Sequence, residues 1–273
     1  MNYSHAFHAG NFADLVKHAA LLAALGRLQL RARPLQVIDT HGGRGVYDLA
    51  APEARRSAEA ERGVARLMEA VDAPGPVRSL RQAVQDFNGG GGAQLYPGSP
   101  RLVADRLRPD DRLTVFELNP REAAVLSSAL KGRAGVDVRE ADGFEAAPGL
   151  APGEGERLIL IDPPFERGDD YARSAEALNR ILARRADATV MIWLPLKDLE
   201  TFDAFLREVG NDADLLVAEV RLRPLRDPLR MNGCALVIAN APMGLEADLE
   251  VICDWTVSVL GEGGASRVWR PGC

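Results

Sequence analysis

Short apolar runs alternate with amphipathic segments along most of this chain, and this alternation constrains the fold more than any other feature. Seven runs have the length and composition of buried strands, at 35–39, 113–117, 136–140, 158–162, 189–194, 215–223 and 235–240. The alternation predicts an α/β fold with a doubly wound, mostly parallel seven-stranded sheet and helices on both faces. The last two runs have no helix between them, so we expect them to form a C-terminal antiparallel strand pair.

Helical periodicity occupies most of the intervening sequence. We expect helices at 15–30, 120–131, 169–185, 196–209 and 245–260, a short turn near 143–147, and a short tail after the last helix. Asn11 and Asp14 are both available to cap the first helix. Segment 46–95 interrupts the alternation with helical stretches at 53–71 and 77–87. We therefore expect one domain over 1–273, with 46–95 as a small helical insertion subdomain.

Composition excludes several classes of protein. The chain is 47% hydrophobic and 26% charged, which is ordinary for a globular protein with a sizeable core. No apolar run approaches the roughly 20 residues needed to cross a bilayer, and the first residues do not resemble a secretory signal. We expect a cytoplasmic protein without membrane association. The four histidines precede residue 42 and the cysteines lie far from them, at 234, 253 and 273, so we expect no metal site.

Charge is unevenly distributed. The formal net charge of −6 argues against non-specific coating of nucleic acid, which needs many phosphate contacts. However, residues 1–36 hold one lysine and three arginines against the single acid Asp14, and residues 221–230 hold four arginines and one aspartate. Such runs are either solvated surface or, where a catalytic site supports it, contacts to an RNA backbone. The sequence leaves both interpretations open.

Polar residues follow the predicted parallel strands where each one ends, which is where ligands of such sheets bind. A glycine turn at 39–45 follows the first strand, Glu117 closes the second, and Asp142 follows the third. The glycine spacing differs from that of dinucleotide and P-loop motifs, which disfavours NAD and ATP. Glu117 can accept hydrogen bonds from ribose hydroxyls and Asp142 from an adenine amine. Each is also compatible with a simple structural role, as a turn residue or an acid before a helix.

The fourth strand end carries the strongest signal. Its apolar run ends in Asp162-Pro163-Pro164-Phe165. Two prolines remove two backbone donors, which leaves the Asp162 carboxylate and the Pro163 carbonyl as acceptors beside a flat ring. Two acceptors can hold both hydrogens of an exocyclic amino group as positive charge develops on its nitrogen. Phe165 can stack on a base, a contact of about 1–3 kcal/mol.

These motifs resemble a known family. The sequence at 162–165 resembles the D/N-P-P-Y/F signature of S-adenosylmethionine-dependent amino-N methyltransferases, and 39–45 resembles their cofactor loop. The sequence at 3–18 is similar to the opening of the RlmJ family, which methylates adenine N6 in 23S ribosomal RNA. The similarity covers essentially the whole chain, including 96–100 and 141–144. Phe165 stands where the family often has tyrosine, and Gly43-Arg44 stands where a pair of small residues is expected.

The resemblance implies a Rossmann-like methyltransferase, a monomer, that binds S-adenosyl-L-methionine and methylates N6 of a specific adenine in 23S ribosomal RNA. It implies that Asp162 is catalytic, together with Pro163 and Phe165, and that Tyr3 and His5 face the RNA. The cofactor residues that it and the glycine turn predict are Lys17, His18, His41, Gly43, Gly45, Ser99, Glu117, Asp142, Gly143 and Asp162. Three alternatives stay open: a DNA adenine-N6 methyltransferase, a protein glutamine-N5 methyltransferase, and a catalytically inactive RNA-binding module.

Overall fold

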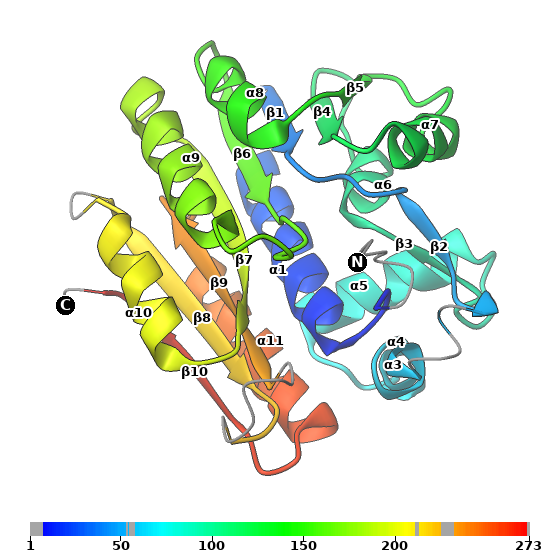
Figure 1. Ribbon diagram of the computed structural model, residues 1–273. Coiled ribbons are helices and arrows are strands. Elements are labelled where there is room, and N and C mark those ends of the chain that lie inside the picture. The colour runs from blue at the N-terminus through cyan, green and yellow to red at the C-terminus, as the bar shows by residue number, and fades with distance from the viewer. Residues whose placement is uncertain (1–7, 53, 55–57, 211–212, 225–231, 272–273) are drawn as a thin grey trace.

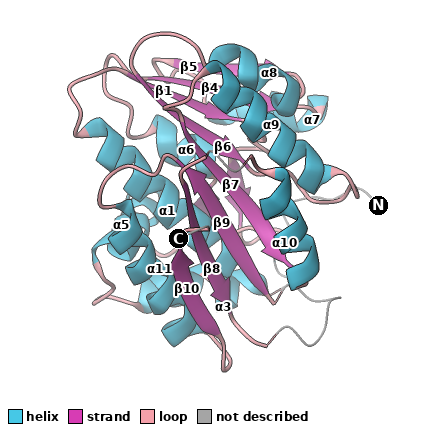
Figure 2. Ribbon diagram, turned by 90° about the vertical axis from the view of Figure 1, so that its left-hand side faces the viewer, coloured by secondary structure: helices cyan, strands magenta, loops and turns pink. Residues whose placement is uncertain are grey.

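The structure is a computed structural model that describes residues 8–52, 54, 58–210, 213–224 and 232–271. A single large sheet runs through the molecule, in the order β10-β8-β9-β7-β6-β1-β4-β5 (Figures 1 and 2). Its strands are β1 (Leu35–Asp39), β4 (Arg112–Glu117), β5 (Val136–Glu140), β6 (Glu156–Ile161), β7 (Thr189–Leu196), β8 (Leu215–Arg221), β9 (Gly233–Ala239) and β10 (Ala265–Trp269). None of the helices in the described part of the chain is long and apolar enough to span a bilayer.

Five neighbouring strands, β5, β4, β1, β6 and β7, are parallel. From β1 the chain first crosses over to β4 and β5 and then returns to place β6 on the other side of β1. This reversal puts a topological switch point beside β1, where open α/β sheets bind their ligands. The remaining strands β9, β8 and β10 pair antiparallel. The predicted fold class and the antiparallel pair are therefore confirmed.

Helices cover both faces of the sheet (Figure 2). One apolar core lies under α1 (Phe12–Gln29), α4 (Val64–Glu69), α5 (Gly75–Phe87), α6 (Ser99–Ala104), α7 (Pro120–Ala129) and α11 (Leu245–Leu260). The second core lies on the opposite face, under α8 (Gly143–Leu150), α9 (Asp170–Arg184) and α10 (Leu199–Glu208). Strands β6, β7 and β9 contribute to both cores and are almost fully buried, as expected of central strands in such a sheet.

The sheet has eight strands and not the predicted seven. The segment after α11, expected to be a tail, forms β10, which pairs with β8 over residues 217–221. Its side chains are only partly buried, because it is an edge strand, so its sequence lacks the apolar run that marks the central strands. Helix α10 also begins three residues later than predicted. Strand β7 continues to Leu196, and Asp198 then caps the helix through the Thr201 amide at 2.7 Å.

Segment 46–95 also differs from the prediction. It begins with β2 (Val46–Asp48), which pairs with β3 (Leu95–Pro97) in a small separate sheet. The single helical stretch expected at 53–71 is two short helices in its described part, α3 (Glu59–Arg62) and α4, with Gly63 between them. A Cβ on Gly63 would lie 2.1 Å from the Gly10 carbonyl oxygen, so the break lets this backbone pack against the start of α1. That 46–95 is a subdomain stays a prediction.

Two further helices were not fully anticipated. Residues 143–150 form the helix α8 where a short turn was expected, and residues 99–104 form α6. Helix α1 begins at Phe12, three residues before the predicted start, because Asn11 caps it by accepting the Asp14 amide at 3.0 Å. Of the two possible caps that the sequence offered, Asn11 and Asp14, the structure therefore has Asn11.

Candidate functional site

The carboxyl ends of the parallel strands open into one cavity of about 1280 Å³. This volume exceeds the roughly 300–1,000 Å³ of a pocket for one drug-sized molecule, so there is room for two ligands. Nearly every predicted site residue in the described part of the chain lines the cavity: Lys17, His18, His41, Gly43, Ser99, Glu117, Asp142, Gly143, Asp162, Pro163 and Phe165. Their individual roles stay predictions.

Three predicted residues are not placed at the cavity. Gly45 is absent from its lining; its carbonyl instead accepts a hydrogen bond from the Gly98 amide at 2.9 Å, which ties the glycine turn to the start of α6. Its φ of +74° explains why glycine is needed there. Gly45 therefore supports the site through the backbone. Tyr3 and His5 lie outside the described residues.

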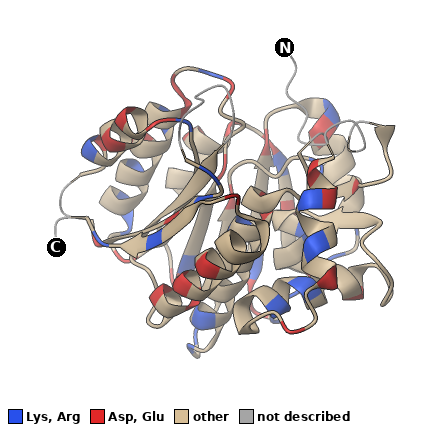
Figure 3. Cartoon of the chain, turned by 90° about the horizontal axis from the view of Figure 1, so that it is seen from below, with Lys and Arg blue, Asp and Glu red and all other residues tan. Residues whose placement is uncertain are grey.

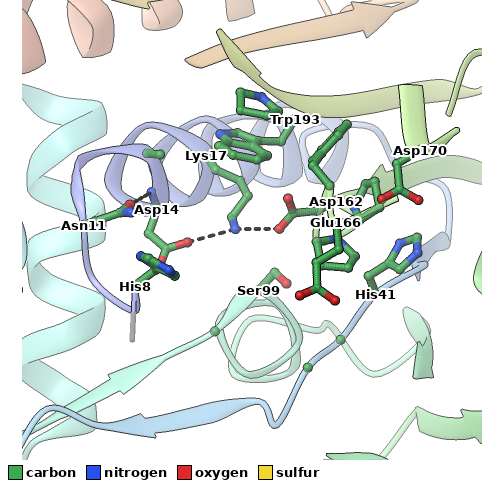
Figure 4. A pocket seen from close by; sticks show the side chains of 18 of the residues that line it. His8, Asn11, Asp14, Lys17, His41, Ser99, Asp162, Glu166, Asp170 and Trp193 are labelled. Atoms are coloured by element: carbon green, nitrogen blue, oxygen red, sulfur yellow. Dashed lines mark hydrogen bonds and ion pairs between the residues drawn. The ribbon is translucent and has the colours of Figure 1, made fainter. Parts of the chain in front are cut away.

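Asp162 lies at the centre of the cavity and is held by a buried lysine (Figure 4). Lys17 Nζ contacts Asp162 Oδ2 at 2.6 Å and Asp14 Oδ1 at 2.9 Å, while only 5% of the lysine side chain is exposed. Burial disfavours the charged ammonium, but the two carboxylates outweigh this and hold the pKa of Lys17 well above its usual value. The ion pair fixes one oxygen of Asp162 and leaves the other free to act.

The free oxygen is Oδ1. Within the described residues it has no hydrogen-bond partner, and 15% of the Asp162 side chain is exposed to the cavity. The next acceptor along the chain, the Pro163 carbonyl, likewise receives no hydrogen bond from that part of the chain. Two unused acceptors thus belong to consecutive residues at the end of β6, both of which line the cavity. Such a pair can hold the two hydrogens of an amino group.

Aromatic rings lie beside this acceptor pair. Phe165 has a φ of +50°, an unusual conformation for a bulky residue. Its ring packs against Tyr171 and Trp193, with centroids 4.9 and 5.7 Å apart. Phe165 is only partly buried and lines the cavity. The unfavourable backbone conformation thus accompanies a flat ring in the cavity wall, three residues after Asp162.

The loop after β1 presents a neutral histidine. Thr40 Oγ1 donates to the Leu160 carbonyl at 3.0 Å, so it must accept from the Nδ1–H of His41 at 2.7 Å. The other ring nitrogen of His41 is then an acceptor. Burial lowers the pKa of His41 to about 4, so the ring is uncharged at neutral pH. Asp39, behind it, accepts from Ser99 Oγ at 2.6 Å, and burial raises its pKa to about 6.

Glu117 closes β4 opposite this loop. Its two oxygens accept the amide hydrogens of Gly43 at 2.9 Å and Asn119 at 2.8 Å. Burial raises the pKa of Glu117. A carboxylate has about four lone-pair positions, so two acceptor positions remain for a ligand. That Glu117 binds a pair of ribose hydroxyls stays a prediction.

Asp142 is more engaged than the sequence suggested. One of its oxygens caps α8 through the Phe144 amide at 3.0 Å, and the other pairs with Arg173 at 2.7 Å. Burial opposes ionisation, but the Arg173 guanidinium outweighs it and lowers the pKa of Asp142. Gly143 approaches the first loop closely, since a Cβ there would lie 2.1 Å from the Thr40 carbonyl oxygen. Any side chain at position 143 would push the loop that follows β1 away from the start of α8.

Several cavity residues escaped sequence reasoning, although some left a signal. Asp14, which the sequence suggested only as a possible helix cap, lies three positions before the predicted site residue Lys17 on the largely apolar, buried helix α1 and hence on the same face. His18, on the same helix, was expected from the resemblance, but its partner Tyr96, at 2.8 Å, was not. Trp193 and Arg173 belong to segments predicted correctly, but nothing in their local sequence shows which way their side chains point.

The insertion also reaches the cavity. Glu59, at the start of α3, accepts from Asn11 Nδ2 at 2.9 Å and contacts His8 Nδ1 at 3.0 Å. All three residues line the cavity. The hydrogen bond that His8 donates to Glu59 raises the pKa of His8. Segment 46–95 therefore packs, through Glu59, against the residues that lead into α1 and forms part of one wall of the cavity.

Comparisons with known proteins agree with this architecture. A family model described as "Ribosomal RNA large subunit methyltransferase D, RlmJ" matches residues 32–271. The chain is 32% identical over 271 residues to a Haemophilus influenzae protein named Ribosomal RNA large subunit methyltransferase J, covering 97% of this chain and 96% of that one. It is 30% identical over 275 residues to the Escherichia coli protein of the same name, covering 98% of each. A crystal structure of a Legionella pneumophila protein superposes with a TM-score of 0.89 at 27% identity, covering 97% of this chain and 99% of that one.

Proposed function

The chain belongs to the Ribosomal RNA large subunit methyltransferase D, RlmJ, family, and on this premise we propose that it methylates N6 of an adenine in 23S ribosomal RNA with S-adenosyl-L-methionine as donor. It is a methyltransferase by family. The substrate is inferred from the names of its relatives and from the chemistry of the cavity. The observation that carries the proposal is the free Oδ1 of Asp162 beside the Pro163 carbonyl, with Oδ2 held by Lys17 at 2.6 Å.

This arrangement suits an amino group attached to an aromatic ring. The nitrogen lone pair of such a group is delocalised, so the amine is a poor nucleophile. Asp162 Oδ1 and the Pro163 carbonyl would each accept one N–H, which favours the lone pair on nitrogen and stabilises the positive charge that develops there. Lys17 fixes the carboxylate orientation in advance, because its ammonium is buried and bound on its other side by Asp14. Phe165 would stack on the adenine ring.

The cavity also fits the cofactor. The remaining acceptor positions of Glu117 suit two ribose hydroxyls, and the neutral His41 offers a further acceptor. The positive φ of Gly43, at +58°, brings its backbone to the same carboxylate. When bound, S-adenosyl-L-methionine supplies an electrophilic methyl carbon. The chain's own residues orient the two reactants and exclude water, which provides much of the acceleration in a direct transfer.

The adenine must leave its base stack to reach Asp162, because the carboxylate lies inside a cavity. Enzymes that act on a base extrude it or use unpaired substrate. An unpaired or flipped nucleotide in ribosomal RNA is therefore the expected substrate. Duplex DNA and a protein glutamine are the alternative acceptors, and both serve as comparison substrates in the test.

The test is a methyl-transfer assay with radiolabelled S-adenosyl-L-methionine and three acceptors: unmodified 23S ribosomal RNA, duplex DNA, and a glutamine-containing protein extract. We expect label in the RNA, recovered as N6-methyladenosine after digestion. Label only in DNA or protein contradicts the proposal, and binding of RNA without transfer supports an inactive binding module.

Asp162→Ala tests the residue that carries the proposal. Removing a preorganised hydrogen-bonding group of this kind lowers kcat by about 10²–10³-fold, while cofactor binding, measured by calorimetry, remains detectable. Asp203→Ala is the matched control, because Asp203 is exposed on α10 and does not line the cavity. Wild-type turnover by Asp162→Ala would contradict the mechanism.

A further inference from the structure

The cavity continues past Asp162 along the sheet, away from Glu117. Strand β9 pairs antiparallel with both β7 and β8, so β8 runs parallel to β7 and its carboxyl end reaches the same edge of the sheet. Residues that follow β7 and β8 therefore meet at this edge. The cavity there is lined by residues of β7, of the segments after β7 and β8, and of the end of α11 with the segment that follows it. We call this set the far arm: Trp193, Lys197, Leu222, Arg223, Leu260 and Glu262.

The two ends of the cavity differ in charge. At the Glu117 end, the acids are Glu117, Glu122 and Asp142. The two arginines that line the cavity near Asp142 are both paired with acids, Arg173 with Asp142 at 2.7 Å and Arg167 with Asp169 at 3.0 Å. The far arm holds two cations, Lys197 and Arg223, against one acid, Glu262. Elsewhere acidic and basic positions alternate along the chain (Figure 3), so this local excess is not part of a generally basic chain, whose formal net charge is −6.

The two cations of the far arm are available for a ligand. Lys197 directly follows β7 and is exposed, and within the described residues its ammonium has no hydrogen bond or ion pair. Arg223 contacts Glu262 Oε1 at 3.2 Å, and its Nε has no partner among the described residues. The acid in this pair is 65% exposed, and exposed pairs contribute only about 0–1 kcal/mol. An incoming anion can replace Glu262 at little cost.

Resting on the proposed function, we propose that the far arm binds the phosphodiester backbone of the substrate RNA next to the target adenine, with Lys197 and Arg223 each contacting a phosphate. The RNA strand then enters over the ends of β7 and β8, and the cofactor occupies the ends of β1, β4 and β5. The two ligands meet at Asp162, which directly follows β6, the strand between β7 and β1.

The chemistry of the far arm favours phosphates over another small ligand. A lysine ammonium is a compact charge and an arginine guanidinium a planar fork, and both are common phosphate ligands. Trp193 supplies an aromatic wall of the far arm, and its ring lies 5.7 Å from that of Phe165. Cations beside stacked aromatic rings are the usual composition of a groove for unpaired nucleic acid.

The experiment compares Lys197→Gln, Arg223→Gln and the double variant with Lys131→Gln and Arg184→Gln. The two control residues are exposed and have no described side-chain partner. Lys131 lies just after α7 and Arg184 is the last residue of α9, at the helix ends that lead back to the opposite edge of the sheet. Binding of a fluorescein-labelled single-stranded RNA 20-mer is measured by anisotropy over a range of salt concentrations. Steady-state kinetics on unmodified 23S ribosomal RNA gives kcat and KM.

Each far-arm substitution should weaken RNA binding about 4-fold at 0.15 M salt and reduce the slope of log affinity against log salt by about 0.7, the value for one phosphate contact on a single strand. The double variant should lose about 15-fold. KM for RNA should rise in parallel, whereas kcat and cofactor affinity stay unchanged, which a general loss of folding would not produce.

Wild-type affinity and salt slope in the double variant, or equal losses in the control variants, would overturn the proposal. Failure of the proposed function looks different, because the wild-type protein would then transfer no methyl group to RNA. The anisotropy measurement tests the far arm in either case, since it does not depend on turnover.

Discussion

Two of the buried ionic clusters among the described residues differ in what they leave free. In the first, Lys17 joins Asp14 to Asp162 at the end of β6. In the second, Glu219 on β8 accepts hydrogen bonds from Arg221, Arg267 and Trp269. Both central carboxylates belong to the sheet region, and both are tied to cations at short range.

The difference is in the unused oxygen. Glu219 is 2% exposed and both of its oxygens are engaged, Oε1 by Arg267 and Trp269 and Oε2 by Arg221. Asp162 has one oxygen engaged and one open to the cavity. A fully satisfied carboxylate can only hold structure together, whereas a carboxylate fixed through one oxygen keeps a preorganised acceptor for a ligand. The comparison shows that pairing alone does not mark a functional acid.

The largest expected effect comes from breaking the first cluster at its cation. Lys17→Met keeps the side-chain volume but takes the ammonium away from Asp14, which is 2% exposed, and from Asp162. Breaking a buried pair on one side costs about 3–5 kcal/mol, so the free energy of unfolding, measured in urea, should fall by this amount. Adding Asp14→Asn should recover part of the loss. A loss below about 1 kcal/mol would show that the ammonium is not needed to balance the two carboxylates.

A smaller effect is expected at the second cluster. Burial opposes ionisation of Glu219, but hydrogen bonds from Arg267, Arg221 and Trp269 outweigh it and lower its pKa. Glu219→Gln should lower the free energy of unfolding by about 2 kcal/mol at pH 7 and leave kcat unchanged. Because the folded-state pKa is lowered, this contribution is present above the unfolded pKa, near 4.5, and is lost as pH falls through the folded value. A fall in kcat together with normal stability would erase the contrast between the clusters.

The smallest effect concerns a cavity group that stays neutral beside the charged pair. Burial lowers the pKa of His41 to about 4, from 6.5. Its contribution to stability is therefore complete above pH 6.5 and is lost as pH falls toward about 4. The difference in unfolding free energy between wild type and His41→Asn should shrink over this range by about 1–2 kcal/mol, less than the full shift implies, because the ring is partly open to the cavity. A difference that grows on acidification would mean that His41 binds its proton more tightly in the folded protein.

Local sequence determined much of the fold and the outline of the site. Strands β1 and β5 and helix α11 have the predicted bounds, and the other predicted strands differ from prediction by one or two residues at an end. Buried strands are continuous apolar runs, and turns need proline, glycine or aspartate, so both are legible within a few residues. For the same reason Asp162, Glu117 and Asp142 could be placed at strand ends and hence at one cavity.

Only the tertiary structure decided which side chains meet. Lys17 and Asp162 are 145 positions apart, and no local pattern shows that α1 packs across the end of β6. Likewise, β8 runs parallel to β7 because β9 lies between them and pairs antiparallel with both. This direction of β8 carries Arg223 to the cavity. Periodicity and turn chemistry act over a few residues, whereas strand order, edge strands and buried ion pairs depend on contacts between distant segments that form only when the whole core packs.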